Sequence, residues 1–495
     1  MHAAVETPAG PRPPARRLAV FAAALLPRAI VAFLTFGAVD AVHNFRNFLL
    51  LVAGREIVTP YLPGIELVLW IEGLLGYRTA LPVMFAWKLL PVLCDALIAL
   101  LLYDAAADAA TGTRRALLYA IAPVPIVVCA IHPQWDSLFL YPLLLALIAV
   151  EIPSTRAAAV AGAALVLSIV AKPVAAPLAL FLFPRSRRAI VAFLAGAAAT
   201  LLLYAALLYA TGLFPTLARV RGVLQYAAGG VQVFGLAFRP HDRFIPVIAA
   251  LALCAFVYFR GRCSRNEAVL LFFAITLGLS GLSVQYLCWI VPFAILCDRL
   301  RFLALYSAVA GIFCLFYYEA PVVNLPHIDD LGAYGLLHPF GAFGPPMPPL
   351  WIRDVVRIDG NILLPLLLLG FAAWRLAAML AGGERATTPA PEPHLARYAA
   401  PAAALLIALA VGAAWAAAQP RVDPDAYVVR IEQKIEAYDV VRYRGPSGTP
   451  GSKVWLARSL VEPEHAHRVI NVTTVGLVAV LLSALAPLLP RKVAS

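Results

Sequence analysis

Residues 185–211 read RSRRAIVAFLAGAAATLLLYAALLYAT, and this stretch decides what kind of protein the chain is. Residues 189–211 contain no charged side chain, and three arginines stand just before them. An α-helix of about 20 residues crosses the hydrocarbon core of a bilayer, which is about 30 Å thick. The stretch therefore predicts a transmembrane helix that begins beside a basic cluster.

The composition extends this prediction to the whole chain. Hydrophobic residues make up 62% of the 495 residues and charged residues 13%, with a mean hydropathy of +0.84. A soluble protein of this length needs far more polar surface, so the chain is predicted to be a polytopic integral membrane protein. The net charge of +12 comes from arginines in short clusters between apolar runs. This pattern is typical of cytoplasmic loops and not of a nucleic-acid-binding groove.

The apolar runs define the predicted fold class, an all-α membrane protein of about 14 transmembrane helices. The first run is long enough to span the membrane and reads as a signal anchor. The runs lie at 18–39, 81–103, 115–131, 134–151, 157–171, 172–184, 188–211, 244–259, 267–283, 284–298, 302–319, 360–380, 397–417 and 470–489.

A further run at 62–76 is assigned by the basic clusters. If it spans the membrane, Arg114–Arg115 falls on the opposite side from later clusters, whereas all clusters share one side if it lies on the surface. The run is short and contains Glu66 and Glu72, so it is predicted to be an interfacial helix. Both termini are then cytoplasmic. The clusters are Arg16–Arg17, Arg114–Arg115, Arg185–Arg187–Arg188, Arg260–Arg262–Arg265, Arg299–Arg301, Arg375–Arg385 and Arg491–Lys492.

The predicted spans divide the chain into three regions. Residues 1–17 form a cytoplasmic tail, and residues 18–320 form a membrane module with external loops at 40–80 and 212–243. Residues 321–495 form a C-terminal membrane region with an external loop at 321–358 and an external insertion at 420–467. Within that insertion, Tyr427–Tyr443 is predicted to be a helix followed by a Gly/Pro turn.

Polar residues of several chemical types fall at the external ends of the predicted spans. Asp40 follows the first span, His132-Pro133-Gln134-Trp135-Asp136 forms a tight turn, and Lys172 stands between two short spans. A mixture of acid, base, cation and amide groups suits a site that binds an anionic head group and moves a proton. The further candidates on this face are Gln285 and Tyr286 in the turn 283–289, and Arg219, Arg221 and Tyr226 in the loop 212–243.

Three charges lie deeper in the predicted membrane. Arg28 and Asp95 stand at similar depths in the first two spans, which are antiparallel neighbours, so we predict a buried structural ion pair between them. Lys88 lies two turns from Asp95 on the same helical face and closer to the external side. It is predicted either to meet a phosphate or to extend toward the interface.

These features resemble the GT-C superfamily of glycosyltransferases, which use polyprenyl-phosphate sugars as donors. The shared features are an acidic residue after the first span, Asp40, and an interfacial helix that starts at Tyr61-Leu62-Pro63. The turn 132–136 is similar to the His-x-Gln-aromatic-Asn/Asp element of N-glycan-assembly glucosyltransferases. The 283–292 segment is similar to an element of the mannosyltransferase that acts on GPI anchors and of its bacterial relatives. The similarity covers about residues 18–320 in order, although Val284 stands where that element has Pro.

The resemblance implies an inverting transfer of a hexose, mannose or glucose, to a lipid or glycan acceptor at the external face of the membrane. The Ala/Arg/Pro-rich composition indicates a bacterial inner membrane. The resemblance assigns the base to Asp40 and the phosphate to Lys172, with Lys88 or Arg219 and Arg221 as alternatives. A divalent cation shared by Asp40 and Asp136 is an open alternative. Tyr226 is assigned either to a loop that orders over the donor or to an interface anchor. The remaining donor- or substrate-binding candidates are His43, Arg46, Tyr61, His132, Gln134, Asp136, Gln285 and Tyr286.

Three other classes of protein fit the same pattern. A transporter or flippase for a lipid-linked sugar would also have many spans, and the short runs 157–171 and 172–184 favour it. A polysaccharide polymerase or ligase would use a large external loop such as 320–358. A non-catalytic scaffold would tolerate substitution of Asp40.

Overall fold

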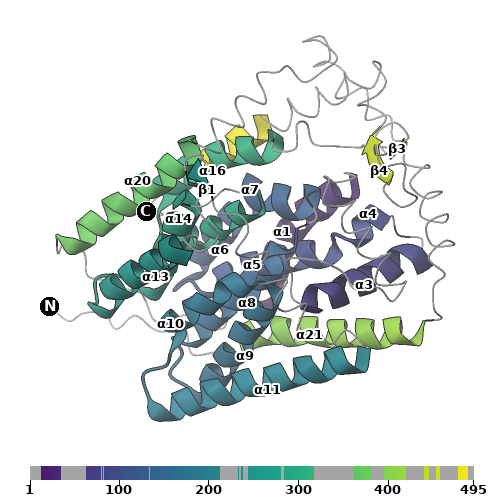
Figure 1. The fold of residues 1–495 in the computed structure, drawn as a ribbon, viewed down its shortest axis with the longest axis horizontal. Helices are drawn as coiled ribbons and strands as arrows, with labels where there is room; N and C mark the ends of the chain where they lie inside the picture. The colour runs from purple at the N-terminus through teal and green to yellow at the C-terminus, as the bar shows by residue number, and fades with distance from the viewer. Residues whose placement is uncertain are drawn as a thin grey trace, which may run out of the picture.

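The computed structural model describes residues 13–34, 63–79, 81, 83–132, 134–211, 232–233, 236–237, 244–279, 284–316, 362–381, 395–419, 440–444, 453–457 and 478–488. These parts of the chain form a helical bundle (Figure 1). The first half contains α1 (Pro14–Leu34), α3 (Pro63–Arg78), α4 (Val83–Ala86), α5 (Leu89–Asp104), α6 (Ala109–Ala120), α7 (Pro123–Ile126), the π-helix η1 (Val127–Ile131), α8 (Asp136–Ala149), α9 (Thr155–Ala171), the 3-10 helix η2 (Pro173–Leu178), α10 (Ala179–Leu182) and α11 (Arg187–Thr211).

The second half contains further helices and two hairpins. The helices are α13 (Phe244–Phe259), α14 (Arg265–Leu279), the 3-10 helix η4 (Val284–Trp289), α15 (Ile290–Leu296), α16 (Leu300–Phe316), α20 (Leu364–Leu380), α21 (Leu395–Ala418) and the segment Val478–Leu488, which ends in the 3-10 helix η8 (Ala486–Leu488). Strand β1 (Gln232–Val233) pairs antiparallel with β2 (Leu236–Ala237), and β3 (Val440–Arg444) with β4 (Lys453–Ala457).

The all-α prediction holds for the bundle, with one correction in the insertion 420–467. Residues 440–443, predicted to end a helix, form most of strand β3, which pairs antiparallel with β4 (Lys453–Ala457). Val440, Val441 and Tyr443 favour a strand, because β-branched and aromatic side chains suit a pleated surface. Residues 427–439 lie outside the described residues.

The lengths of the helices confirm the membrane prediction only in part. Among the described residues, Arg187–Ala210 and Tyr398–Ala418 are long and apolar enough to cross a membrane. The broken helix Ala109–Ala120 with Pro123–Ile131, bent by 51°, adds a third if it is one span. Eight other apolar helices in this part of the chain have 10–17 residues. Each predicted apolar run contains a helix, but the expected count of about 14 full-length spans is not confirmed.

The predicted spans 172–184 and 284–298 are each split into two short helices. In the first, Pro173 follows Lys172 and η2 gives way to α10, which ends at Leu182. In the second, η4 precedes α15, which ends at Leu296. Proline disfavours the helical conformation of the residue before it, which explains why α9 stops at Ala171.

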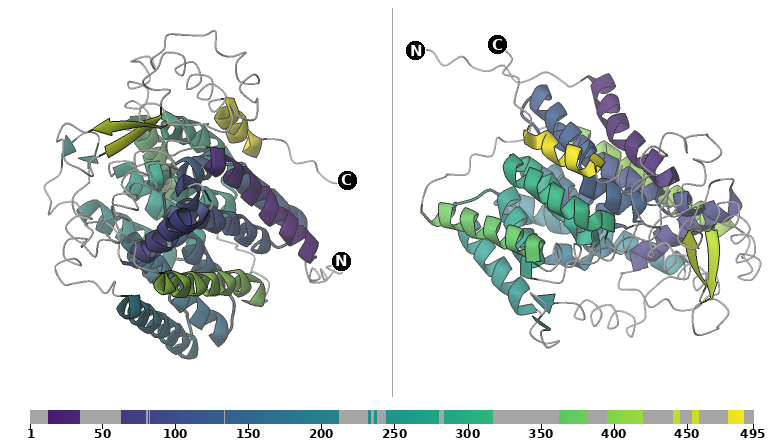
Figure 2. Two further views of the ribbon diagram at one scale, coloured as in Figure 1. Left: turned by 90° about the vertical axis from the view of Figure 1, so that its right-hand side faces the viewer. Right: turned by 90° about the horizontal axis from the view of Figure 1, so that it is seen from above.

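Helices α9 and α11 pack with their backbones almost in contact. A Cβ atom at Gly162 would lie 2.0 Å from the carbonyl oxygen of Phe193, and one at Gly196 would lie 2.0 Å from that of Ala159. Small residues at such positions let apolar helices approach closely. Outside this contact α11 exposes large apolar side chains such as Leu202, and it lies with α21 along one outer side of the bundle (Figures 1 and 2).

Arginines from distant segments converge on one end of the bundle, here called the arginine end. Arg17 at the start of α1 donates to Asp104 at the end of α5, with its Nη2 2.8 Å from Oδ2. The Tyr398 hydroxyl of α21 donates to the carbonyl of the same Asp104 at 3.0 Å. Arg114 of α6 lies 3.8 Å from Asp298, which precedes α16. The two contacts of Asp104 thereby hold the ends of α1, α5 and α21 together.

Two glutamates, the buried Glu267 and the exposed Glu151, complete the arginine end. Glu267 at the start of α14 accepts hydrogen bonds from Arg299 at 2.8 Å and from Arg375 of α20 at 2.6 Å. Arg265 pairs with Glu151, between α8 and α9, at 2.6 Å. The basic clusters that these arginines represent therefore share one end of the bundle, as predicted from the charges, together with acidic partners that were not predicted.

Candidate functional site

Half of the candidate residues lie at the end of the bundle opposite to the arginine end, here called the site end. The helix α8 begins there at Asp136, and α9 ends there beside Lys172. The described candidates are Lys88, His132, Gln134, Asp136, Lys172, Gln285 and Tyr286. Asp40, His43, Arg46, Tyr61, Arg219, Arg221 and Tyr226 lie outside the described residues.

The end of η1 at Ile131 and the start of α8 at Asp136 place Asp136 at the site end. The π-helix η1 closes with the amide of His132 donating to the carbonyl of Val127 at 2.9 Å. Helix α8 then begins at Asp136, where the partial positive charge of a helix N-terminus favours a carboxylate. The Ser137 hydroxyl donates to the carbonyl of Pro91 at 2.8 Å and fixes this turn on α5.

Lys172 and Asp136 form a partly buried ion pair. Lys172 caps the C-terminus of α9 in an extended conformation, so its side chain leaves the helix at the site end. Its Nζ lies 2.6 Å from Oδ1 of Asp136, and the two side chains are 13% and 1% exposed. The indole Nε1 of Trp289 donates to the same Oδ1 at 2.6 Å. One carboxylate oxygen thus receives two charge-assisted hydrogen bonds in a largely desolvated place.

Three aromatic rings surround the ammonium of Lys172. Its Nζ lies 4.7 Å from the ring centroid of Tyr286, 5.1 Å from that of Trp289 and 5.8 Å from that of Phe139. Such cation–π contacts stabilise a cation whose hydration shell has been partly removed. We call Lys172, Asp136, Phe139, Tyr286 and Trp289 the lysine cluster. It joins α8, α9 and η4, which are far apart in the sequence.

Trp289 and Phe139 were not predicted as site residues. Both stand close in sequence to candidates, Trp289 three residues after Tyr286 and Phe139 three residues after Asp136. In a helix that spacing places two side chains on the same face, which is the signal that could have identified them. The rings of Phe139 and Trp289 meet edge to face, with centroids 5.1 Å apart.

His132 and Gln134 have structural contacts at the same end. The Nε2 of His132 lies 3.2 Å from the carbonyl oxygen of Cys314, so this nitrogen carries the proton and donates. The bond ties η1 to α16. The backbone amide of Gln134 donates to the carbonyl of His132 at 2.6 Å, and both side chains are buried. The side chain of Gln285 is only partly buried, beside the lysine cluster in sequence.

Lys88 lies at the N-terminus of α5 and is fully buried, so its predicted extension toward the interface is wrong. Its Nζ donates to the carbonyl oxygen of Ala32 in the last turn of α1, at 3.2 Å. Lys88 lies in the turn between α4 and α5. From this turn its side chain points into the protein, toward α1. Lys88 therefore fixes the end of α1, from which the chain continues toward Asp40.

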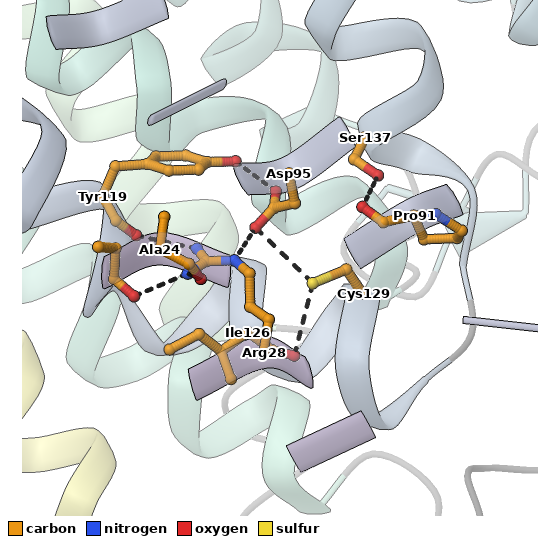
Figure 3. A network of polar contacts seen from close by, with 9 residues as sticks. Ala24, Arg28, Pro91, Asp95, Tyr119, Ile126, Cys129 and Ser137 are labelled. Carbon is orange, nitrogen blue, oxygen red and sulfur yellow. Dashed lines mark hydrogen bonds and ion pairs between the residues drawn. The ribbon is translucent and has the colours of Figure 1, made fainter. Parts of the chain in front are cut away.

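The predicted ion pair between Arg28 and Asp95 is confirmed (Figure 3). Arg28 also donates to the carbonyls of Ala120 at 2.8 Å and Tyr119 at 3.1 Å, and the Tyr119 hydroxyl donates to Asp95 at 2.5 Å. These two carbonyls belong to the last turn of α6, just before the 51° bend, where helix carbonyls lack intrahelical partners. Arg28 therefore satisfies the backbone at the break as well as the charge of Asp95.

Helix α3, the predicted interfacial helix, packs against the protein with both of its glutamates buried. Glu66 and Glu72 are 1% and 3% exposed. Oε1 of Glu72 accepts a hydrogen bond from the amide of Leu90, at the start of α5, at 3.0 Å. Burial raises the pKa of Glu72 to about 8, although that hydrogen bond opposes the rise. Glu72 thus packs α3 onto the site end as a carboxylic acid that is neutral below this pH.

A metal site is not visible in the described part of the chain, where no three His, Cys, Asp or Glu side chains gather. The predicted alternative of a cation between Asp40 and Asp136 stays a prediction, because Asp40 lies outside the described residues. No protein-family model and no curated protein matches the chain. The residues of the site itself are therefore the basis for a function.

Proposed function

We propose that this chain is a membrane glycosyltransferase that transfers a hexose, mannose or glucose, from a polyprenyl-phosphate donor to a lipid or glycan acceptor. The lysine cluster is the observation that carries the proposal. It brings Lys172 together with the segments around 132–136 and 283–289, which resemble elements of GT-C enzymes in the same order. A cation enclosed by aromatic rings beside polar side chains suits a phosphate linked to a sugar.

The proposed setting is the inner membrane of a bacterium, crossed about 14 times with both termini in the cytoplasm. The arginine end then faces the cytoplasm, because arginines accumulate on that side of membrane proteins. The site end faces outward. Helices shorter than about 20 residues fit this arrangement where neighbouring helices and turn residues surround them at the membrane surface.

In the proposed reaction an acceptor hydroxyl attacks the anomeric carbon of the donor sugar. Asp40 takes the proton of that hydroxyl, and the bond between the anomeric carbon and the phosphate oxygen breaks. The electron pair leaves with polyprenyl phosphate, whose negative charge Lys172 stabilises. The configuration at the anomeric carbon inverts because the attack comes from the opposite side.

The direct test is transfer of radiolabelled sugar by the purified protein in lipid vesicles. Polyprenyl-phosphate mannose and polyprenyl-phosphate glucose are supplied as donors with a membrane extract of acceptors. Asp40→Asn should reduce transfer by about 100- to 10,000-fold, the usual contribution of a positioned general base. The matched control is Asp298→Asn at the arginine end, which should leave transfer unchanged. Full turnover by the Asp40 variant would disprove the base assignment.

A second test concerns the phosphate. Lys172→Ala should raise the KM for the donor more than it lowers kcat, because the phosphate is bound in the ground state as well as in the transition state. An unchanged KM would argue against a phosphate at Lys172.

A transporter of a lipid-linked sugar is the second candidate function. The observation that favours it is the broken helix formed by α6, α7 and η1, with the buried Arg28–Asp95 pair at the break. Broken helices with charges near the midplane are typical of substrate sites in transporters. Movement of a labelled lipid-linked sugar between leaflets of a vesicle, without any transfer to an acceptor, would favour this candidate.

A further inference from the structure

The ammonium of Lys172 and the carboxylate of Asp136 form an ion pair and neutralise each other. Oδ1 of Asp136 lies 2.6 Å from Nζ of Lys172, and the remaining surroundings of the ammonium include three aromatic rings. An anion that approaches Lys172 therefore meets a neutral pair instead of a free cation. Its own charge is also repelled by a carboxylate in a place of low dielectric constant, where such repulsion is strong.

If Lys172 moves to another partner, Asp136 still has two sources of stabilisation. The indole Nε1 of Trp289 donates to the same Oδ1 at 2.6 Å. Asp136 is also the first residue of α8, where the helix dipole favours a negative charge. With these two sources of stabilisation, Asp136 keeps a hydrogen-bond donor when the lysine takes another partner.

We propose that Asp136 is an internal counter-ion that holds Lys172 until the phosphate of a prenyl lipid displaces it. A phosphate oxygen takes the place of Oδ1 beside Nζ, while Asp136 keeps the hydrogen bond from Trp289. This inference rests on the proposed function only for the identity of the anion. It changes the role of Asp136 from a lining residue of the sugar pocket to a positioning residue that sets how tightly the lipid phosphate binds.

The two roles predict opposite signs for the same substitution. If Asp136 lines a pocket for the ligand or permanently orients Lys172, removing its charge weakens phosphate binding. If Asp136 competes with the phosphate, removing its charge strengthens that binding. Asp136→Asn keeps the size of the side chain, and Asp136→Ser removes the charge with a smaller side chain that cannot overfill the site.

The experiment measures equilibrium binding of a tritiated short-chain isoprenyl monophosphate to the full-length protein in detergent. The matching isoprenol, without phosphate, and inorganic phosphate, without a prenyl chain, are measured beside it. We expect both Asp136 variants to bind the isoprenyl phosphate at least tenfold more tightly than wild type, with unchanged affinity for the isoprenol. Lys172→Met should weaken phosphate binding, and Asp136→Asn should give no gain in the Lys172→Met background.

The inference would be overturned if a folded Asp136 variant bound the isoprenyl phosphate no more tightly than wild type. It would also be overturned if Asp136→Asn still increased the affinity in the Lys172→Met background. A gain for inorganic phosphate alone would overturn the prenyl lipid as the ligand. Folding of each variant is checked by a monodisperse size-exclusion profile. Because no step of the assay requires sugar transfer, a protein that binds as expected but transfers no sugar would refute the proposed reaction and leave the counter-ion role standing.

Discussion

The buried pair of Arg28 and Asp95 gives a stability prediction whose size follows from the geometry. Arg28 is fully buried and Asp95 is 2% exposed, so neither charge can be hydrated if its partner is removed. Breaking such a pair from one side costs about 3–5 kcal/mol. Asp95→Asn should therefore destabilise the protein by about this amount.

Arg28→Met should cost at least as much, for a reason that is visible at the bend after α6. The guanidinium donates to the carbonyls of Tyr119 and Ala120 as well as to Asp95. Each buried acceptor left without a donor costs about 1–3 kcal/mol. The double variant Arg28→Met with Asp95→Leu leaves no uncompensated charge. Its loss of stability should therefore be about 2–5 kcal/mol smaller than the sum of the losses in the two single variants.

The assay is a double-mutant cycle on the free energy of unfolding, measured by titration of the detergent-solubilised protein with a denaturing detergent. The matched controls are Arg262→Met and Asp298→Asn, which change exposed side chains and should cost less than about 0.5 kcal/mol. Additive effects in the cycle, or single variants as stable as the controls, would refute the pairing as a source of stability.

Two further predictions concern glutamates. Glu267→Gln should cost about 3–5 kcal/mol in the same titration, because the buried Arg375 loses its carboxylate partner. Glu151→Gln is the control and should cost less than about 1 kcal/mol, because the side chain of Glu151 is 39% exposed. Equal costs for the two variants would contradict the reasoning. For Glu72, in a helix outside the proposed spans, burial raises the pKa to about 8, above the value of a free carboxyl group. Its neutral form favours folding, so its contribution is complete at low pH and is lost as the pH rises toward and through about 8. Stability should fall between about pH 4.5 and about pH 8, by at most about 1.4 kcal/mol per pH unit, and level off above that, and Glu72→Gln should flatten this fall.

The sequence was sufficient to predict where helices form. Apolar runs need a buried or lipid-facing helix wherever they occur, so each run contains one. Depth along two neighbouring spans was enough to pair Arg28 with Asp95, because a buried charge requires a partner of opposite sign at the same level. These predictions depend only on position along a helix axis.

The sequence did not show which direction around a helix axis a side chain faces, or how separate segments pack against each other. The burial of Glu72 depends on how α3 lies against α5, which the basic clusters and the two glutamates used to place that helix could not show. The inward turn of Lys88 depends on a change of direction after α4. The aromatic rings around Lys172 come from α8 and η4, and the register between those elements is set by tertiary packing.

The two ends of the bundle use different cations, and the difference is consistent with different roles. At the arginine end Arg375 places two nitrogens on one oxygen of Glu267, at 2.9 and 2.6 Å, and a guanidinium with several donors in fixed directions holds such a partner in one geometry. At the site end Lys172 meets Asp136 through a single ammonium group, which is a point charge on a flexible chain. An ammonium can turn from one oxygen to another without breaking a planar fork. The arginine end is therefore suited to holding helices together, and the site end to exchanging a carboxylate for a phosphate.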